Sequence, residues 1–284
     1  MEKIESLWLV TNAASGSNDE DALAALKQSF TAAGIAIVRI VNFPDDDLPT
    51  AQELDQAGSP LVAVFAGDGT INALVTSLYG WGGAILILPG GTMNLLYHRL
   101  HGQQDLDQVL DAVSTGKARR CRPAIIRCDG GDGFAGVMAG PGTAWNDVRE
   151  AMRDIDIPGI ASGAAKAISQ SVAAPMIACV EPRLGREEGY PLLVLTPQGG
   201  GFIIDAYHAE TVGDYLAQGL ALLKRDFREG PSDRLGTVKE LVVRSVSSDP
   251  IGLLVDGEPA DTGSQARFTL ALCEVDLLAT SFDE

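Results

Sequence analysis

Two short, unbroken apolar runs constrain the fold of this chain more than any other feature of its sequence. Residues Leu61–Phe65 and Ala84–Leu88 contain no polar side chain. Strands of this kind are covered on both faces, which is typical of a parallel sheet packed between helices. Helical patterns at Asp19–Ala33 and Asp105–Ser114, with a strand pattern at Ile35–Val41, alternate with these runs. The alternation predicts an open α/β sheet joined by crossover helices.

The pattern changes after the basic stretch Gly116–Arg120. Strand-like runs then dominate, and helical periodicity remains only at Trp145–Asp154, Ala161–Val172 and Val212–Leu223. We therefore predict an α/β plus β protein with two domains, 1–120 and 121–284, the second built mainly on antiparallel strands. The last strand of the chain is a candidate to return to the first domain.

The net charge of −17 bears on possible partners. Nucleic acid is an unfavourable partner, because phosphate backbones are held by clustered Lys and Arg, and permanent attachment to an anionic membrane is unfavourable for the same reason. No apolar run approaches the ~18 residues that span a bilayer, and the N-terminus lacks the features of a secretory signal. Four cysteines without paired spacing indicate free thiols rather than a zinc site. We expect a cytoplasmic protein.

Three turns with unusual chemistry follow predicted strands of the first domain. They are Asn12–Gly16, Ala66–Thr70 and Pro89–Asn94. Carboxyl ends of parallel strands meet at one edge of the sheet, where ligands bind. Glycine-rich backbone and helix N-termini bind anions, so the three turns together predict a polyphosphate site. A carboxylate at Asp68 is explained if it holds Mg²⁺, although a single Gly-Asp-Gly turn is more often only a tight turn.

The motifs in these turns resemble those of a known family. Ala66–Asn72 resembles the Gly-Gly-Asp-Gly-Thr signature of diacylglycerol, sphingosine and related lipid kinases, and Pro89–Asn94 resembles their Pro-x-Gly-Thr-x-Asn signature. Asn12–Gly16 is similar to their Asn-Pro-x-Ser-Gly, with Ala13 in place of Pro. Val255–Glu258 resembles the Asp-Gly-Glu found late in their second domain. The order of the four motifs identifies the chain as similar to the bacterial branch of the diacylglycerol kinase family.

The resemblance implies a Rossmann-like first domain and an ATP site in a cleft between the two domains. It implies Asp256 as the general base, with Glu258 beside the metal and nucleotide, and Asp68 as the Mg²⁺ ligand. The residues that it implies at the nucleotide are Asn12, Ser15, Gly16, Gly67, Asp68, Gly69, Thr70, Asn72, Gly91, Thr92 and Asn94. The acceptor would be a hydroxyl of diacylglycerol or a similar amphiphile, with only transient contact to a membrane.

Two positions depart from the family pattern. Leu95 stands where the family usually has Asp, and Ala124 lies in the stretch where a second acid is expected. Both acids organise Mg²⁺ through water in the family, so their absence leaves open a nucleotide- or lipid-binding protein that transfers phosphate weakly or not at all. A second alternative is an NAD kinase, which shares the Gly-Asp-Gly signature and the overall fold, but the Thr92–Leu96 sequence disfavours it. The sequence does not identify the acceptor, and it is compatible with a homodimer.

Overall fold

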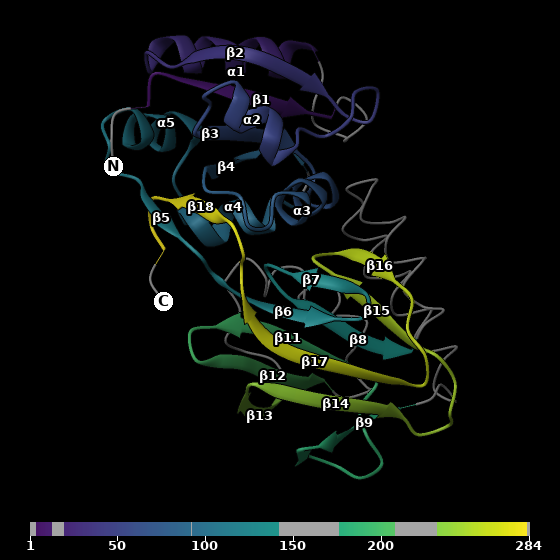
Figure 1. Cartoon of the computed structure of the whole chain (residues 1–284). Coiled ribbons are helices and arrows are strands. Elements are labelled where there is room, and N and C mark those ends of the chain that lie inside the picture. The colour runs from purple at the N-terminus through teal and green to yellow at the C-terminus, as the bar shows by residue number, and fades with distance from the viewer. Residues whose placement is uncertain (1–3, 13–19, 92, 142–175, 208–231, 283–284) are drawn as a thin grey trace. The chain divides into compact units, whose positions relative to one another are not determined.

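The computed structural model describes residues 4–12, 20–91, 93–141, 176–207 and 232–282 (Figure 1). The chain forms two compact units. The first unit consists of residues 1–123 and 272–284, and the second of residues 124–271. The first unit therefore extends slightly beyond residue 120 and also includes the C-terminal segment.

The first unit contains a six-stranded sheet in the order β2-β1-β3-β4-β18-β5. Its strands are β1 (Ser6–Thr11), β2 (Ala36–Asn42), β3 (Leu61–Ala66), β4 (Ala84–Pro89), β5 (Arg119–Cys121) and β18 (Asp276–Ala279). All neighbouring pairs are parallel except β18 and β5. The last strand thus lies beside β4, where Asp276 accepts hydrogen bonds from Arg120 and Arg122.

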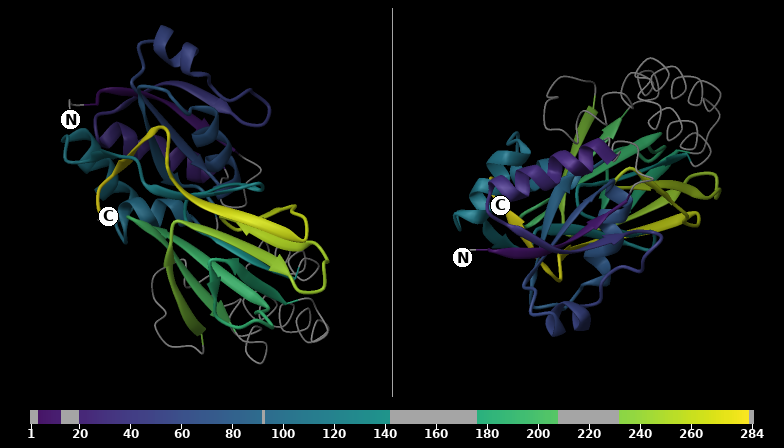
Figure 2. Two further views of the ribbon diagram at one scale, coloured as in Figure 1. Left: turned by 60° about the horizontal axis from the view of Figure 1, so that its bottom comes forward. Right: turned by 90° about the horizontal axis from the view of Figure 1, so that it is seen from above.

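Five helices accompany this sheet in the described residues: α1 (Glu20–Ala32), α2 (Ala51–Gln56), α3 (Asp68–Ser77), α4 (Leu95–His101) and α5 (Leu106–Ser114). Figure 2 shows helices on both faces of the sheet. Every residue of β3 is buried, as the apolar run predicts. None of the described helices has the length and apolar character needed to cross a membrane.

The second unit consists of two six-stranded sheets. One has the order β10-β9-β14-β17-β6-β7, from β6 (Ala124–Cys128), β7 (Gly131–Gly133), β9 (Ile177–Glu181), β10 (Arg183–Leu184), β14 (Glu240–Ser245) and β17 (Gln265–Leu272). The other has the order β13-β12-β11-β8-β15-β16, from β8 (Val137–Pro141), β11 (Leu192–Gln198), β12 (Gly201–Tyr207), β13 (Ser232–Val238), β15 (Ile251–Val255) and β16 (Glu258–Ala260).

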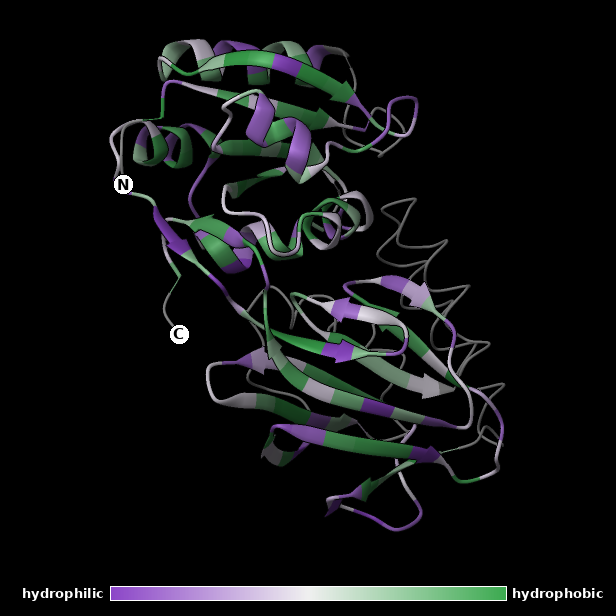
Figure 3. Cartoon of the chain, viewed as in Figure 1, coloured by the Kyte–Doolittle hydropathy of each residue, from purple (hydrophilic) through white to green (hydrophobic). Residues whose placement is uncertain are grey.

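Side chains from the two sheets form one hydrophobic core, which includes Tyr190, Phe202 and Phe268. Figure 3 shows hydrophobic residues along the strands of both units. Nine neighbouring pairs of strands in the second unit, among them β11–β12 and β14–β17, are antiparallel. The expected α/β plus β fold class is confirmed.

Two details of the strand assignment differ from the sequence prediction. The pattern of Val238–Val246 predicts one strand, but the chain leaves β13 at Val238 and enters β14 at Glu240. Residues Phe134–Gly136, expected at the start of a strand, form a loop before β8. The three helical patterns predicted in the second domain lie outside the described residues.

A buried histidine connects α4 to the C-terminal segment in the first unit. The ring of His101 is fully buried, its Nδ1 lies 3.0 Å from Thr280 Oγ1, and its centroid lies 4.9 Å from that of Tyr97. Its Nε2 has no partner of acceptable hydrogen-bond geometry among the described residues, and the Ile87 carbonyl offsets the effect of burial only in part. Burial lowers the pKa of His101 from 6.5 to about 4. The imidazole is therefore neutral in the folded protein at neutral pH.

We predict that His101 makes the protein sensitive to mild acid. Below pH 6.5 His101 is protonated in the unfolded chain but stays neutral in the folded protein. The contribution of His101 to the free energy of unfolding is therefore full above pH 6.5 and is lost as the pH falls towards 4. Between pH 7.5 and 4.5 the free energy of unfolding should fall by about 2–3 kcal/mol more in the wild type than in His101→Gln. Urea unfolding at the two pH values measures this difference.

Tyr97→Phe is the matched control, because it alters the same cluster without removing the titrating group. It should keep the pH dependence of the wild type. Equal pH dependence in His101→Gln and the wild type would contradict the assignment.

Candidate functional site

The turns that follow β1, β3 and β4 lie at one edge of the first sheet, because these three strands are parallel neighbours. Asn12, the residue after β1, donates a hydrogen bond from Nδ2 to Thr70 Oγ1 at 2.9 Å. Thr70 is buried in the first turn of α3. This bond fixes the end of β1 against the helix that follows β3.

Helix α3 begins within the Gly-Asp-Gly-Thr motif. Its N-cap is Gly67, which has extended backbone angles and provides no side-chain cap, and Asp68, Gly69 and Thr70 form the first turn. Amide hydrogens in the first turn of a helix have no intrahelical acceptor, and the helix dipole adds positive potential there. The start of α3 therefore presents donors suited to an anion such as phosphate.

The glycines after β4 are required because two turns touch through their backbones. A Cβ atom on Gly90 would overlap the backbone nitrogen of Ala66, and one on Gly91 would lie 2.7 Å from the Cα of Gly67. Only residues without a side chain allow the β4 turn to approach the β3 turn so closely. The contact also explains why Ala66 is tolerated where the kinase signature has Gly: its own side chain is buried and the close approach is provided by Gly90.

Asn94 shapes the turn after β4. It adopts a left-handed conformation with φ of 51° at the N-cap of α4. Its Oδ1 accepts a hydrogen bond from Gly91 N, and its Nδ2 donates one to Gly91 O, both at 2.8 Å. Asn94 therefore holds the backbone of the turn, which is a structural reason for the Asn of the motif.

Asp68 links the two turns. Its Oδ1 accepts a hydrogen bond from the backbone N–H of Leu95 at 3.0 Å. The side chain of Leu95 is buried, so it belongs to the hydrophobic core of the first unit. Within the described ranges, no group of three or more His, Cys, Asp and Glu side chains is arranged to hold a metal ion. Asp68 as a lone carboxylate fits Mg²⁺, which proteins usually bind through one or two carboxylates together with substrate phosphates and water.

In the second unit, Asp256 accepts three backbone hydrogen bonds from one loop. Its Oδ2 accepts from Phe134 N at 2.8 Å, and its Oδ1 accepts from Ala135 N at 2.7 Å and Gly136 N at 3.0 Å. The Asp256 amide in turn donates to Gly136 O. The carboxylate is buried, with 7% of the residue exposed. Three N–H donors stabilise its negative charge and fix its position.

Asp256 and Gly257 are also the two central residues of the hairpin between β15 and β16, with φ values of 51° and 88°. The two-residue turn of this hairpin requires positive φ at both positions. The sequence Asp256-Gly257 predicts a hairpin between Ile251–Val255 and Phe268–Leu272; the hairpin exists, but its second strand is β16. Asp256 and Gly257 form the turn, and Asp256 also supplies the fixed carboxylate. Glu258 follows at the exposed start of β16.

The sequence-predicted residues are distributed over both units. The first unit brings together Asn12, Gly67, Asp68, Gly69, Thr70, Gly91 and Asn94 at one sheet edge, with Asn72 half-buried further along α3. The second unit contains Asp256 and Glu258. Ser15, Gly16 and Thr92 lie outside the described residues. Ala124, which replaces an expected acid, is buried in β6.

Sequence reasoning missed two contributions. The amides of Phe134–Gly136 hold Asp256, and the only signal for this loop was the glycine-rich run before it. The turn-rich sequence around Asp132 predicts a solvated loop residue, which is wrong. It is buried in β7 and forms a two-pronged ion pair with Arg127, with both distances 2.8 Å.

Known proteins resemble this chain in sequence over the first unit and in fold over most of its length. Residues 6–126 match the family model for the diacylglycerol kinase catalytic domain. A candidate diacylglycerol kinase from Bacillus anthracis strain Sterne has a similar structure, with 15% sequence identity, a TM-score of 0.65, and coverage of 98% of this chain and 96% of that one. A diacylglycerol kinase from the same strain has 15% identity and a TM-score of 0.62, with 98% of each chain covered. A search of curated proteins found no match.

We predict that Gly91→Ala destabilises the first unit by about 1–3 kcal/mol, because the new Cβ must push the two turns apart. Gly82→Ala is the control, since a Cβ at Gly82 meets no atom within 4 Å. Chemical unfolding of both variants measures the difference. Equal stabilities would show that the two turns do not need this close approach.

We also predict a structural cost at Asp256. An Asn side chain has one acceptor oxygen where the carboxylate has two, so Asp256→Asn should lower the free energy of unfolding by about 2 kcal/mol or more. Asp261→Asn, the same change at an exposed position, should change stability by less than about 0.5 kcal/mol. If both variants unfold like the wild type, the three amide bonds do not stabilise the loop.

Proposed function

Because residues 6–126 carry a domain of the diacylglycerol kinase catalytic domain family, we propose that this protein is an ATP-dependent lipid kinase. It transfers the γ-phosphoryl group of ATP to a hydroxyl of diacylglycerol or a similar amphiphile. The observation that carries the proposal is the sheet edge where the uncapped start of α3 meets the Gly90–Gly91 turn. Such an edge suits a polyphosphate.

The residues of this edge have separate roles in the proposal. Amides at the start of α3 and the glycine turn after β4 receive the phosphates, while Asn12 and Asn94 keep the turns in place. Asp68 is the residue that would hold Mg²⁺. A bound Mg²⁺ would neutralise charge that develops on the phosphate oxygens.

Asp256 is the proposed proton acceptor. The acceptor hydroxyl oxygen forms a bond to the γ-phosphorus, the bond from that phosphorus to the bridging oxygen breaks, and ADP leaves with the electron pair. The hydroxyl proton passes to the Asp256 carboxylate, whose position the Phe134–Gly136 amides fix. Phosphoryl transfer depends mainly on positioning and charge stabilisation, so a carboxylate held at this fixed position suits the task.

We predict that Asp256→Asn lowers the transfer rate by at least about 10²-fold, as expected for loss of a general base, and leaves ATP affinity within about threefold. The assay measures radiolabelled phosphate passing from ATP to a panel of lipids in mixed micelles, with NAD as a control acceptor. It is run at a temperature where circular dichroism shows that the variant is folded, and ATP binding is measured separately. Loss of ATP binding by the folded variant would refute the role given to Asp256.

We predict that Asp68→Ala raises the Mg²⁺ concentration needed for half-maximal transfer. Asp68→Asn serves as a matched variant, because the amide keeps an oxygen that can accept from Leu95 N but removes the charge that attracts the cation. Both variants should shift the magnesium titration. A titration that matches the wild type in both would exclude Asp68 as the magnesium residue.

The replacement of two family acids favours a second candidate. Leu95 and Ala124 are buried apolar residues, and neither can take part in a network of metal and water. A protein that binds nucleotide or lipid without efficient phosphoryl transfer would tolerate both of these apolar replacements. Measurable ATP binding without transfer to any acceptor, including NAD, would favour this candidate.

A further inference from the structure

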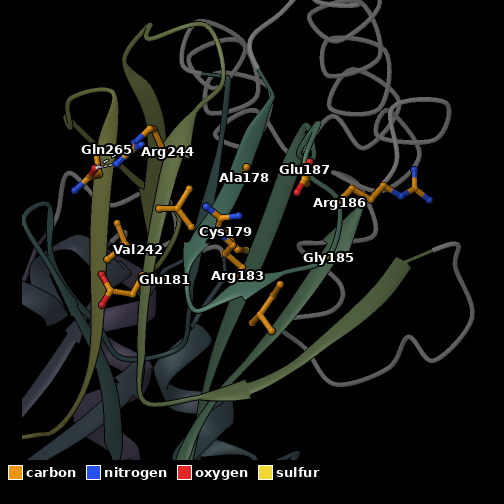
Figure 4. A pocket seen from close by; sticks show the side chains of 12 residues that line it. Ala178, Cys179, Glu181, Arg183, Gly185, Arg186, Glu187, Val242, Arg244 and Gln265 are labelled. Atoms are coloured by element: carbon orange, nitrogen blue, oxygen red, sulfur yellow. Dashed lines mark hydrogen bonds between the residues drawn. The ribbon is translucent and has the colours of Figure 1, made fainter.

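The second unit contains a hollow lined by charged side chains that the proposed kinase reaction does not use. It has a volume of about 630 Å³ and lies over β9, β10, β14 and β17. Figure 4 shows the side chains around it. Its volume lies in the range of small-molecule sites, roughly 300–1,000 Å³.

Two of the three arginines that line the hollow differ from the other arginines in this unit. The described part of the second unit has six arginines, and four of them pair with a carboxylate: Arg127 with Asp132, Arg186 with Asp233, Arg234 with Asp205 and Arg267 with Glu240. Arg183 and Arg244 have no carboxylate partner among the described residues, and both line the hollow. Arg244 is held by Gln265, whose Oε1 accepts from its Nε and Nη2 at 3.3 and 3.0 Å.

Two carboxylates, Glu181 and Glu187, also line the hollow, and within the described residues neither forms an ion pair. Beside Arg186, which pairs with Asp233, two cationic and two anionic side chains that form no ion pair among the described residues therefore share the hollow. Between them lie the apolar side chains of Ala178, Val180 and Val242. A simple anion would be attracted by the arginines and repelled by the glutamates. A ligand with both charges, separated by a short hydrocarbon link, satisfies both.

The loop that follows β10 and carries Glu187 is held in a defined conformation. Gly185 has a φ of 69°, and a Cβ at this position would overlap the hydroxyl of Tyr190. Tyr190 is buried, and its hydroxyl accepts a hydrogen bond from Arg186 N at 3.1 Å. A loop fixed in this way presents its charges with little loss of entropy on binding.

We propose that this hollow binds a zwitterion in which a phosphate is joined to an ammonium group by a short carbon chain. Arg183 and Arg244 bind the phosphate, and Glu181 binds the ammonium. A free phosphoamine and the headgroup of a zwitterionic phospholipid share this chemistry. The site lies wholly within the second unit, and its occupancy does not depend on the kinase activity proposed above.

Calorimetric titration with O-phosphoethanolamine, without ATP, tests the site. It should bind at least about tenfold more tightly than inorganic phosphate or ethanolamine, because each of these satisfies only one set of charges. Arg183→Gln, Arg244→Gln and Glu181→Gln should each weaken binding about threefold, the scale of an exposed ion pair. Arg267→Gln, outside the hollow and paired with Glu240, should leave affinity unchanged.

A second arm uses vesicles of phosphatidylethanolamine and phosphatidylcholine. If the protein sediments with the vesicles, and less of it does so in Arg183→Gln, the ligand is a lipid headgroup. Binding of the soluble compound alone identifies a free solute. Inorganic phosphate binding as tightly as phosphoethanolamine, or tighter phosphate binding in Glu181→Gln with no loss of phosphoethanolamine affinity, would overturn the proposal. Absence of binding to both probes at millimolar concentration would also overturn it.

Discussion

The first unit depends on a contact between two backbones. The turn after β4 lies so close to the turn after β3 that Gly90 and Gly91 have no room for a Cβ atom. Because neighbouring parallel strands bring these turns to one edge, the contact places the start of α3 beside the glycine turn. Asp68 and Asn94 then stabilise the arrangement through bonds to Leu95 N and to both backbone groups of Gly91. The proposed phosphate site follows from this close approach.

In the second unit, a hairpin turn holds a neighbouring loop in place. The positive φ angles of Asp256 and Gly257 reverse the chain between β15 and β16, and the Asp256 carboxylate gathers the three amides of the Phe134–Gly136 loop. A turn residue that also fixes a distant loop explains a buried acid at the tip of a hairpin. It also means that the structural and the proposed catalytic demands on Asp256 cannot be separated by activity alone. Stability and binding must be measured together.

The sequence predicted the fold class and the position of the glycine turns, because apolar runs and turn residues are local signals. The predicted strand Leu61–Phe65 corresponds to β3, whereas α3 begins at Asp68, within the residues expected to form a turn. The carboxylate contacts were not predictable in this way. Asp256 meets residues about 120 positions earlier in the chain, and Asp132 is buried only because Arg127 lies opposite on the paired strand. Such contacts depend on strand register, which local patterns do not specify.

The claim at the centre of this account is that the edge formed by the β3 and β4 turns binds the phosphates of ATP. Amide hydrogen exchange over residues 66–72 and 89–95, with ATP, with adenosine and without ligand, tests it most directly. The account predicts that ATP slows exchange at Asp68–Thr70 and at Gly90–Gly91, and that adenosine does not, because the phosphates supply the acceptors. Exchange that ATP leaves unchanged, or that adenosine slows equally, would contradict it.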